Sequence, residues 1–166
     1  MIKTKILDEN YHLITTPHYP WGRPQKMLRE KPHKAIIGIG GNIGDVLRRF
    51  ERLFWLLRSS PFVDILQSAP ILRNPPFGFT QQAHFYNSLL VITTQLTPRE
   101  LLEYLLRIEK RFGRKRLFKD APRTLDLDII FYDDLQISSK RLTIPHPKWM
   151  QRESVLIPLK FLKRQQ

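Results

Sequence analysis

Two acidic residues interrupt an apolar, strand-like run at residues 123–131, which reads Arg-Thr-Leu-Asp-Leu-Asp-Ile-Ile-Phe. In an extended strand, Asp126 and Asp128 share one face and lie about 6.5–7 Å apart along it. The alternating apolar residues share the other face: Leu125, Leu127, Ile129 and Phe131. The pattern therefore predicts a strand with one apolar face and one paired-carboxylate face.

Paired carboxylates of this kind are candidate metal ligands. Two ionised groups so close repel each other and resist desolvation, which favours a cation between them. Mg²⁺ prefers hard oxygen ligands and is usually held by one or two carboxylates together with phosphate oxygens of a substrate. A half-exposed strand with a polar outer face produces the same pattern and is an equal alternative at this point.

A dense cationic segment leads directly into this strand. Its basic residues are Arg107, Lys110, Arg111, Arg114, Lys115, Arg116, Lys119 and Arg123. Phosphoryl transfer needs positive charge around the transferring group, and an arginine can hold a phosphate at two points. Cations next to metal-binding acids therefore indicate a polyphosphate substrate, with a solvated basic loop or a nucleic-acid patch as the alternative.

Composition excludes several classes of protein. A chain of 166 residues can form one domain with a sizeable core and leaves little room for a second. The absence of cysteine excludes a disulfide framework and thiolate chemistry. No apolar run approaches the roughly 20 residues of a membrane span, and the polar start lacks the core of a secretion signal. We expect a cytoplasmic protein with no membrane partner, and the formal charge of +13 indicates anionic ligands.

The chain is expected to divide into an N-terminal arm, residues 1–33, and a domain, residues 34–166. Prolines interrupt any regular element in the arm; they are Pro17, Pro20, Pro24 and Pro32. Tyr11, Tyr19 and Trp21 are able to dock on the domain surface. We therefore expect an arm that is partly ordered or docked, with a loose tail as the alternative.

Periodicity in the remaining sequence predicts an α+β fold. Strands are predicted at residues 34–40, 62–68, 87–95 and 124–132. Helices are predicted after Asp45 and after the capping box Thr97–Glu100, and Gly113 ends the second one. This order is that of a ferredoxin-like split βαβ (βαββαβ) sandwich, in which both helices pack on one face of a mainly antiparallel sheet. A short C-terminal extension follows, and the other face of the sheet is left for a site.

The glycines at 38, 40, 41 and 44 match neither a dinucleotide-binding nor a P-loop pattern. We expect them to permit a tight turn or a close approach of the backbone.

The stretch Pro122–Asp128 reads P-R-T-L-D-L-D, and five further segments surround it in order. They are residues 39–45, 73–78, 85–87, 109–116 and 142–147. With these segments the chain resembles the 6-hydroxymethyl-7,8-dihydropterin pyrophosphokinase family over about residues 35–159. Enzymes of this family move a pyrophosphoryl group from ATP to a pterin alcohol and release AMP.

The resemblance implies roles for residues around ATP, which would be a co-substrate. Asp126 and Asp128 would hold two Mg²⁺ ions, and Arg114 and Arg123 would act on the transferring group. Further ATP contacts are implied for Glu109, Arg116, Ile129, Thr143, His146 and Arg152. No protein nucleophile is implied. The basic loop, residues 114–119, is expected to close over the substrates and exclude water.

The resemblance also implies a pterin site. Phe85 would stack on the ring, and Asn87, two residues later on the same face, would bond ring heteroatoms. Asn74, Pro75 and Phe77 would supply contacts from the preceding loop. Ordinary core packing is the alternative for Phe85 alone, and a structural role is the alternative for His146.

The chain departs from the family pattern at several positions. Before the acidic strand the family commonly has W-G-P-R, where this chain has residues 119–123 and a connection one residue shorter. The Trp that would close over the site is absent. Phe118 is a candidate substitute. Ser154 stands where a second aromatic would stack on the pterin, and Trp149 is a candidate replacement. Pro147 and Leu106 also differ from residues found in relatives, where an aromatic and Gln occur.

From these features we expect a pyrophosphokinase of folate biosynthesis that uses MgATP and 6-hydroxymethyl-7,8-dihydropterin. We expect a monomer whose partners are these small molecules and not nucleic acid. The main alternative is a basic RNA-binding module of split βαβ fold, but the sequence lacks an RNP-like aromatic pattern. A regulatory ligand-binding domain without catalysis is a second alternative, against which the retained arginines and aspartates argue.

Overall fold

The computed structural model describes residues 1–20 and 31–162. Trp21 and Pro24 lie outside the described residues. The elements are β1 (Lys3–Ile6), β2 (His12–Thr15), β3 (His33–Gly41), α1 (Val46–Arg58), β4 (Val63–Ser68), β5 (Ile71–Asn74), β6 (Phe85–Thr94), α2 (Pro98–Arg111), β7 (Asp126–Tyr132), β8 (Ile137–Ser138), β9 (Thr143–Ile144), a 3-10 turn (Trp149–Gln151) and α3 (Glu153–Lys160). Within these ranges, no helix has the length and apolar character needed to span a bilayer.

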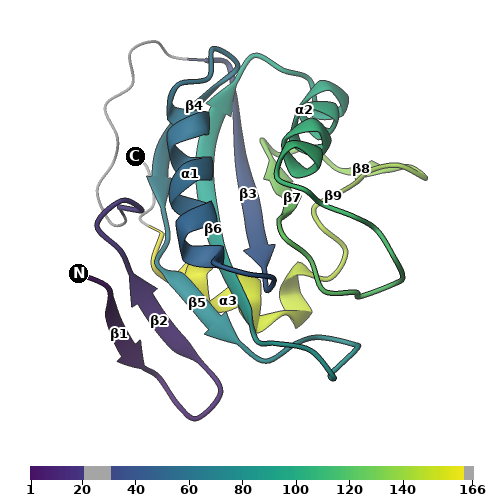
Figure 1. Ribbon diagram of the computed structural model, residues 1–166. Coiled ribbons are helices and arrows are strands. Elements are labelled where there is room, and N and C mark those ends of the chain that lie inside the picture. Colours follow the sequence, from purple (N-terminus) through teal and green to yellow (C-terminus); the bar gives the residue numbers. More distant parts are fainter. Residues whose placement is uncertain (21–30, 163–166) are drawn as a thin grey trace.

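Seven strands form one antiparallel sheet (Figure 1). Its order is β1-β2-β5-β6-β3-β7, and β4 pairs with the other end of the long strand β6. The short strands β8 and β9 form a separate pair. The mainly antiparallel sheet with helices packed on it confirms the predicted α+β class.

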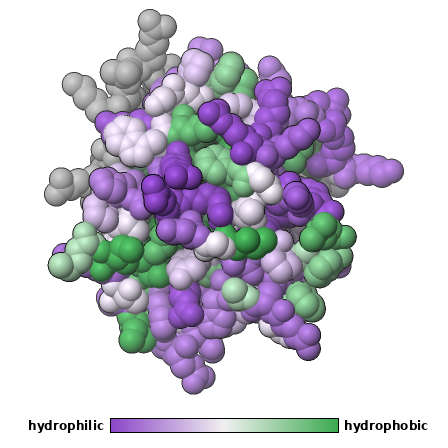
Figure 2. Space-filling view, viewed as in Figure 1, coloured by the Kyte–Doolittle hydropathy of each residue, from purple (hydrophilic) through white to green (hydrophobic). Residues whose placement is uncertain are grey.

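The two long helices begin where the sequence predicts. Asp45 caps α1 by accepting a bond from the backbone N–H of Arg48. Thr97 and Glu100 form the complete capping box at the start of α2. Both helices bury one apolar stripe against the sheet, and their outward faces are largely hydrophilic (Figure 2).

Apolar side chains pack on both faces of the sheet. Residues of α1 and α2 form the larger cluster with β3, β4, β6 and β7, which we call the helix-side core. The smaller cluster on the opposite face, the α3-side cluster, comprises Ala69, Leu89, Ile130 and Val155. Both long helices therefore cover one face, and α3 covers only part of the other, which leaves room there for a site (Figure 1).

One predicted facing on β7 is wrong. Phe131 does not join Leu125, Leu127 and Ile129 in the helix-side core but packs with the α3-side cluster. The cause is a β-bulge: β3 residues Ile36 and Ile37 pair with Phe131 and Ile129, so Ile130 is an extra residue. An extra residue reverses the alternation of side chains beyond it.

The expectation that prolines interrupt any regular element in residues 1–33 is also wrong. Strands β1 and β2 form a hairpin that joins the main sheet, and β2 pairs with β5. The prolines of this region follow the hairpin in sequence, so they do not interrupt it. Strand β5 itself is absent from the prediction, and β6 begins two residues earlier than predicted, at Phe85.

Candidate active site

A cleft opens on the sheet face opposite to α1 and α2. Nine predicted site residues line it: Asn74, Phe77, Phe85, Asn87, Arg123, Asp126, Asp128, His146 and Arg152. Arg114 and Arg116 line an adjoining groove, which the basic loop, residues 114–119, forms together with Asp120, Ala121 and Arg123. One face of the sheet therefore collects side chains from distant parts of the sequence.

The two aspartates project from β7 into this cleft. Asp126 pairs with Gly40 of β3 and Asp128 pairs with Gly38, so no side chain of β3 stands between them and the open space. Burial, followed by repulsion from Asp126 and Glu109, raises the pKa of Asp128 to about 7. The predicted facing of the two carboxylates is confirmed.

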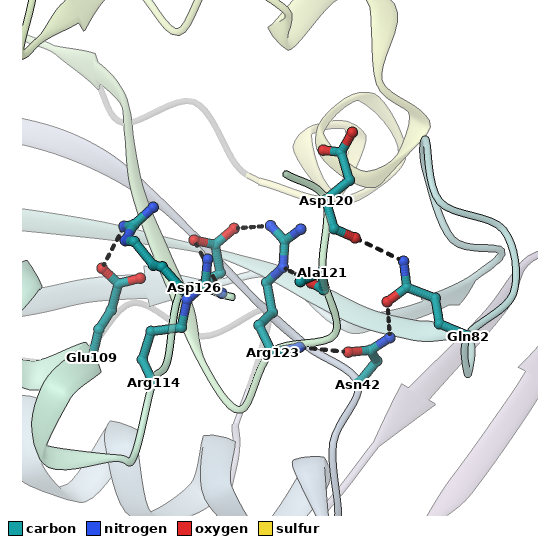
Figure 3. Close-up of polar contacts among 9 residues, drawn as sticks. Asn42, Gln82, Glu109, Arg114, Asp120, Ala121, Arg123 and Asp126 are labelled. Carbon is teal, nitrogen blue, oxygen red and sulfur yellow. Dashed lines mark hydrogen bonds and ion pairs between the residues drawn. The ribbon is translucent and has the colours of Figure 1, made fainter. Parts of the chain in front are cut away.

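Two arginines converge on Asp126 (Figure 3). Arg123 Nη1 lies 2.9 Å from Asp126 Oδ2, and Arg114 Nη1 lies 4.0 Å from Asp126 Oδ1. The buried Nε and Nη1 atoms of Arg114 have no hydrogen-bond partner, and burial lowers the pKa of this guanidinium. Buried donors without partners are costly, so Arg114 is suited to an anionic ligand.

Glu109 lies in the last turn of α2, near Arg114 and Asp126. Its side chain is 3% exposed, and its Oε1 atom has no hydrogen-bond partner. Burial, then repulsion from Asp126, raises the pKa of Glu109 to about 7. The exposed Arg116 lies 3.7 Å from Glu109 Oε2 through its Nη2 atom. Glu109 thus adds an acidic group that responds to the charge in the cleft.

His146 and Arg152 enter from the C-terminal segment. The backbone N–H of His146 donates to the carbonyl of Ile130 at 2.9 Å, which fixes the residue beside β7. Burial, with Arg152 nearby, lowers the pKa of His146 below its usual 6.5, which favours a neutral imidazole. The buried Arg152 Nε has no partner, and its guanidinium lies 5.4 Å from the ring centre of Phe77.

Besides Glu109 and Arg116, two further predicted ATP contacts do not line the cleft. The side chain of Ile129 packs in the helix-side core, so any contact from it would have to come from its backbone. Thr143 is exposed on β9 and does not line the cleft.

The predicted pterin residues meet at the ends of β5 and β6. Asn87 Nδ2 donates to Asn74 Oδ1 at 2.6 Å, and Asn74 Nδ2 donates to the Pro75 carbonyl at 2.9 Å. A Cβ atom on Gly40 would lie 2.6 Å from Asn87 Oδ1. The expected close approach is therefore confirmed at Gly40, where glycine makes room for the amide. The guanidinium of Arg123 lies 5.2 Å from the ring centre of Phe85.

Two further residues join the loops around the cleft, and sequence reasoning missed both. Asn42 Oδ1 accepts from the backbone N–H of Arg123, and Asn42 Nδ2 donates to Gln82 Oε1, both at 2.9 Å. Gln82 Nε2 donates to the Asp120 carbonyl at 2.9 Å (Figure 3). The only local signal was the glycine-rich turn around Asn42, which predicts backbone shape and not a link to two distant loops.

The candidate substitutes for missing aromatics have different outcomes. Phe118 makes an edge contact with Phe79 across the two loops, with ring centres 5.4 Å apart. Trp149 packs against Phe131, 5.0 Å between ring centres, and does not line the cleft. The bulge in β7 places Phe131 on the α3 side of the sheet, where its ring meets that of Trp149. Ser154 itself lines the cleft.

An α+β domain whose cleft joins paired carboxylates with partly unsatisfied arginines belongs to the class of proteins that act on polyphosphates. Over residues 36–164 the sequence matches the family 7,8-dihydro-6-hydroxymethylpterin-pyrophosphokinase (HPPK). The chain belongs to this family. It is an ATP-dependent pyrophosphokinase that transfers a pyrophosphoryl group to hydroxymethyldihydropterin in folate biosynthesis, which confirms the predicted family and activity.

Curated relatives agree with this assignment. A 2-amino-4-hydroxy-6-hydroxymethyldihydropteridine pyrophosphokinase from Helicobacter pylori is 41% identical over 129 residues, covering 76% of this chain and 79% of the relative. A protein of the same description from Campylobacter jejuni is 40% identical over 132 residues, covering 80% and 84%. The mitochondrial folate synthesis bifunctional protein of Pisum sativum is 36% identical over 132 residues, covering 80% of this chain and 25% of the relative.

Proposed function

We propose that Arg114, Arg123, Asp126 and Asp128 form the centre at which the pyrophosphoryl group is transferred. The observation that carries the proposal is the convergence of two arginines on a carboxylate of the paired set, with donor atoms of Arg114 left unsatisfied. Such a site attracts a polyanion and a cation together. ATP with its metal ions supplies both.

The donor set suits Mg²⁺. Within residues 1–20 and 31–162, no group of three or more His, Cys, Asp or Glu side chains is arranged to hold a metal by itself. Mg²⁺ needs no such cage, because waters and phosphate oxygens complete its shell. Asp126 and Asp128 would therefore hold two Mg²⁺ ions together with ATP. Bound there, the metal would neutralise phosphate oxygens and make the β-phosphorus easier to attack.

The arginines would follow the charge during transfer. The hydroxyl oxygen of the pterin forms a bond to the β-phosphorus, the bond to the oxygen bridging the α- and β-phosphorus atoms breaks, and AMP leaves as the hydroxyl proton is released. The contacts of Arg114 and Arg123 with Asp126 support a role for both residues in holding the transferring group. Electrostatic stabilisation of this kind needs no covalent intermediate with the protein.

The pterin would lie across the ends of β5 and β6. Phe85 offers an aromatic face, and the bonded amides of Asn74 and Asn87 offer donors and acceptors for ring heteroatoms. Pro75 and Phe77 would contact the edge of the ring from the loop. Arg123 now lies over the Phe85 ring and would leave it as the phosphates draw the guanidinium away.

The remaining ATP contacts would come from Arg116, His146 and Arg152, with Glu109 beside Arg116. A neutral His146 can bond a phosphate or the metal shell without adding charge. We further propose contacts from the backbone of Ile129 and from Thr143.

At the level of the whole chain, we propose that residues 34–166 form the ferredoxin-like split βαβ enzyme domain and residues 1–33 an accessory segment. The proposed enzyme works as a cytoplasmic monomer and binds no nucleic acid.

Incubation of the protein with ATP, Mg²⁺ and the reduced hydroxymethylpterin tests the chemistry. We expect equal amounts of AMP and pterin diphosphate, and the Asp126→Asn variant should form neither at a comparable rate. Formation of ADP would mean simple phosphoryl transfer and would reject the proposal.

A further inference from the structure

The N-terminal hairpin lies outside the part of the chain that matches the family, yet it is bonded to the strands of the proposed pterin site. Strand β2 pairs with β5 through His12, Leu13 and Ile14. Their partners on β5 are Arg73, Leu72 and Ile71. The family match begins only at residue 36. This chain therefore adds strands to a sheet edge next to the substrate residues.

The pairing continues from β5 to the pterin residues. Leu72 pairs with Asn87, and Asn74 pairs with Phe85. Strand β5 has only four residues, and without β2 one of its edges would be free. A short strand bonded on both edges holds its register better than one bonded on a single edge. The position of Asn74 opposite Phe85 thus depends in part on the hairpin.

Tyr19 adds a second bond from the same segment. Its side chain is 1% exposed, and its hydroxyl donates to Ser88 Oγ at 2.8 Å. Ser88 Oγ in turn donates to the Ala69 carbonyl at 2.9 Å. Burial raises the pKa of the Tyr19 hydroxyl, so it stays a neutral donor. Because Ser88 follows Asn87 directly, this chain of bonds fixes β6 at the point where it enters the pterin site.

The ring of Tyr19 is held from the other side by α1. Its centre lies 6.2 Å from that of Phe50 and 5.7 Å from that of Phe54. The segment is therefore packed into the helix-side core and is not a loosely attached tail.

We propose that the hairpin and Tyr19 form a positioning element for the pterin site, which holds Asn74, Phe85 and Asn87 in register. Tyr19 is a positioning residue and touches no substrate. The inference rests on the proposed pterin site. The proposed metal ligands Asp126 and Asp128 lie on β7, which is separated from β6 by β3. Loss of this positioning element should therefore weaken pterin binding and leave MgATP binding unchanged.

The test compares Tyr19→Phe with Tyr104→Phe. Tyr104 is a matched control, because its hydroxyl also donates to a serine, Ser60 Oγ at 2.7 Å, but in a groove between α1 and α2 that does not adjoin the cleft. Pterin affinity is measured by fluorescence titration in Mg²⁺ and a non-hydrolysable ATP analogue, and the affinity of the analogue and the unfolding midpoint are measured in parallel.

We expect Tyr19→Phe to weaken pterin binding by roughly two- to tenfold, the value of one hydrogen bond, and to leave analogue binding unchanged. Tyr104→Phe should lower the unfolding midpoint and leave both affinities unchanged. If Asn87→Ala loses pterin binding, equal pterin affinity in Tyr19→Phe and the unchanged protein would overturn the proposed positioning role. Intact pterin binding in Asn87→Ala would instead reject the proposed pterin site.

Discussion

Arg123 and Asp126 form a 2.9 Å ion pair at the centre of the cleft. The arginine proposed to hold the transferring group thus neutralises a carboxylate proposed to hold the metal. When MgATP binds, Arg123 can pair with a phosphate in place of Asp126, and Asp126 can bind Mg²⁺ in place of Arg123. The charge of the site therefore changes little.

This pairing leads to a prediction for the two arginines. Arg114→Ala or Arg123→Ala should lower kcat by about 10²–10³, because charge that develops during transfer loses its partner. The affinity for MgATP should fall much less, since other cations remain. Steady-state kinetics with both substrates separates the effect on kcat from the effect on MgATP affinity. Arg111→Ala, which removes an exposed charge from α2, is the control. An unchanged kcat in either variant would reject that residue's role.

Metal dependence should follow from the paired carboxylates. Chelation of Mg²⁺ should abolish AMP formation, and renewed Mg²⁺ should restore it. Asp128→Asn should raise the Mg²⁺ concentration needed for half-maximal activity by ~10–100-fold or more. Loss of a residue that only supports a metal ligand already costs this much metal affinity, and Asp128 is proposed to bind the metal directly. A titration of activity with Mg²⁺ measures this, and full turnover after chelation would contradict the metal assignment.

Gly40→Ala should destabilise the protein through one contact. The new Cβ would lie 2.6 Å from Asn87 Oδ1, and overpacking of this kind costs about 1–3 kcal/mol. In an Asn87→Ala background, the same change should cost clearly less, because the opposing oxygen is gone. Chemical denaturation of the four proteins gives both costs. Equal costs in the two backgrounds would show that the strain lies elsewhere.

Phe118 should help to exclude water from the site. Its ring contacts Phe79, and the two loops also meet where Gly78 lies against the side chain of Asp120. Phe118→Ala should increase the share of AMP formed without pterin diphosphate, since water competes as acceptor. Leu117→Ala is the neighbouring control, because this side chain is 76% exposed. The two products are quantified together, and equal ratios in both variants would oppose a sealing role for Phe118.

His146 should titrate below its usual pKa of 6.5 because it is partly buried beside Arg152. A histidine whose folded pKa is lowered contributes stability that is fully present above pH 6.5 and is lost as the pH falls through the folded value. His146→Gln should therefore flatten the decline of stability below pH 6.5. An NMR titration of the ring measures the midpoint, and a value at or above 6.5 would contradict the prediction.

Local sequence patterns predicted those features that depend on neighbours in the chain. The period of two placed Asp126 and Asp128 on one face, and the capping box marked the start of α2. The family motifs pointed to the residues that line the cleft, because they are short, ordered and specific. These features needed no knowledge of distant contacts.

Other features depend on which segments meet. The bulge that turns Phe131 arises from pairing with β3, almost 100 residues earlier, and β2 is a strand because β5 offers it an edge. Asn42 reaches Arg123 and Gln82 only after three loops converge. A hydrogen bond or a register shift belongs to a pair of segments, so residue types and periods along one segment carry no information about it.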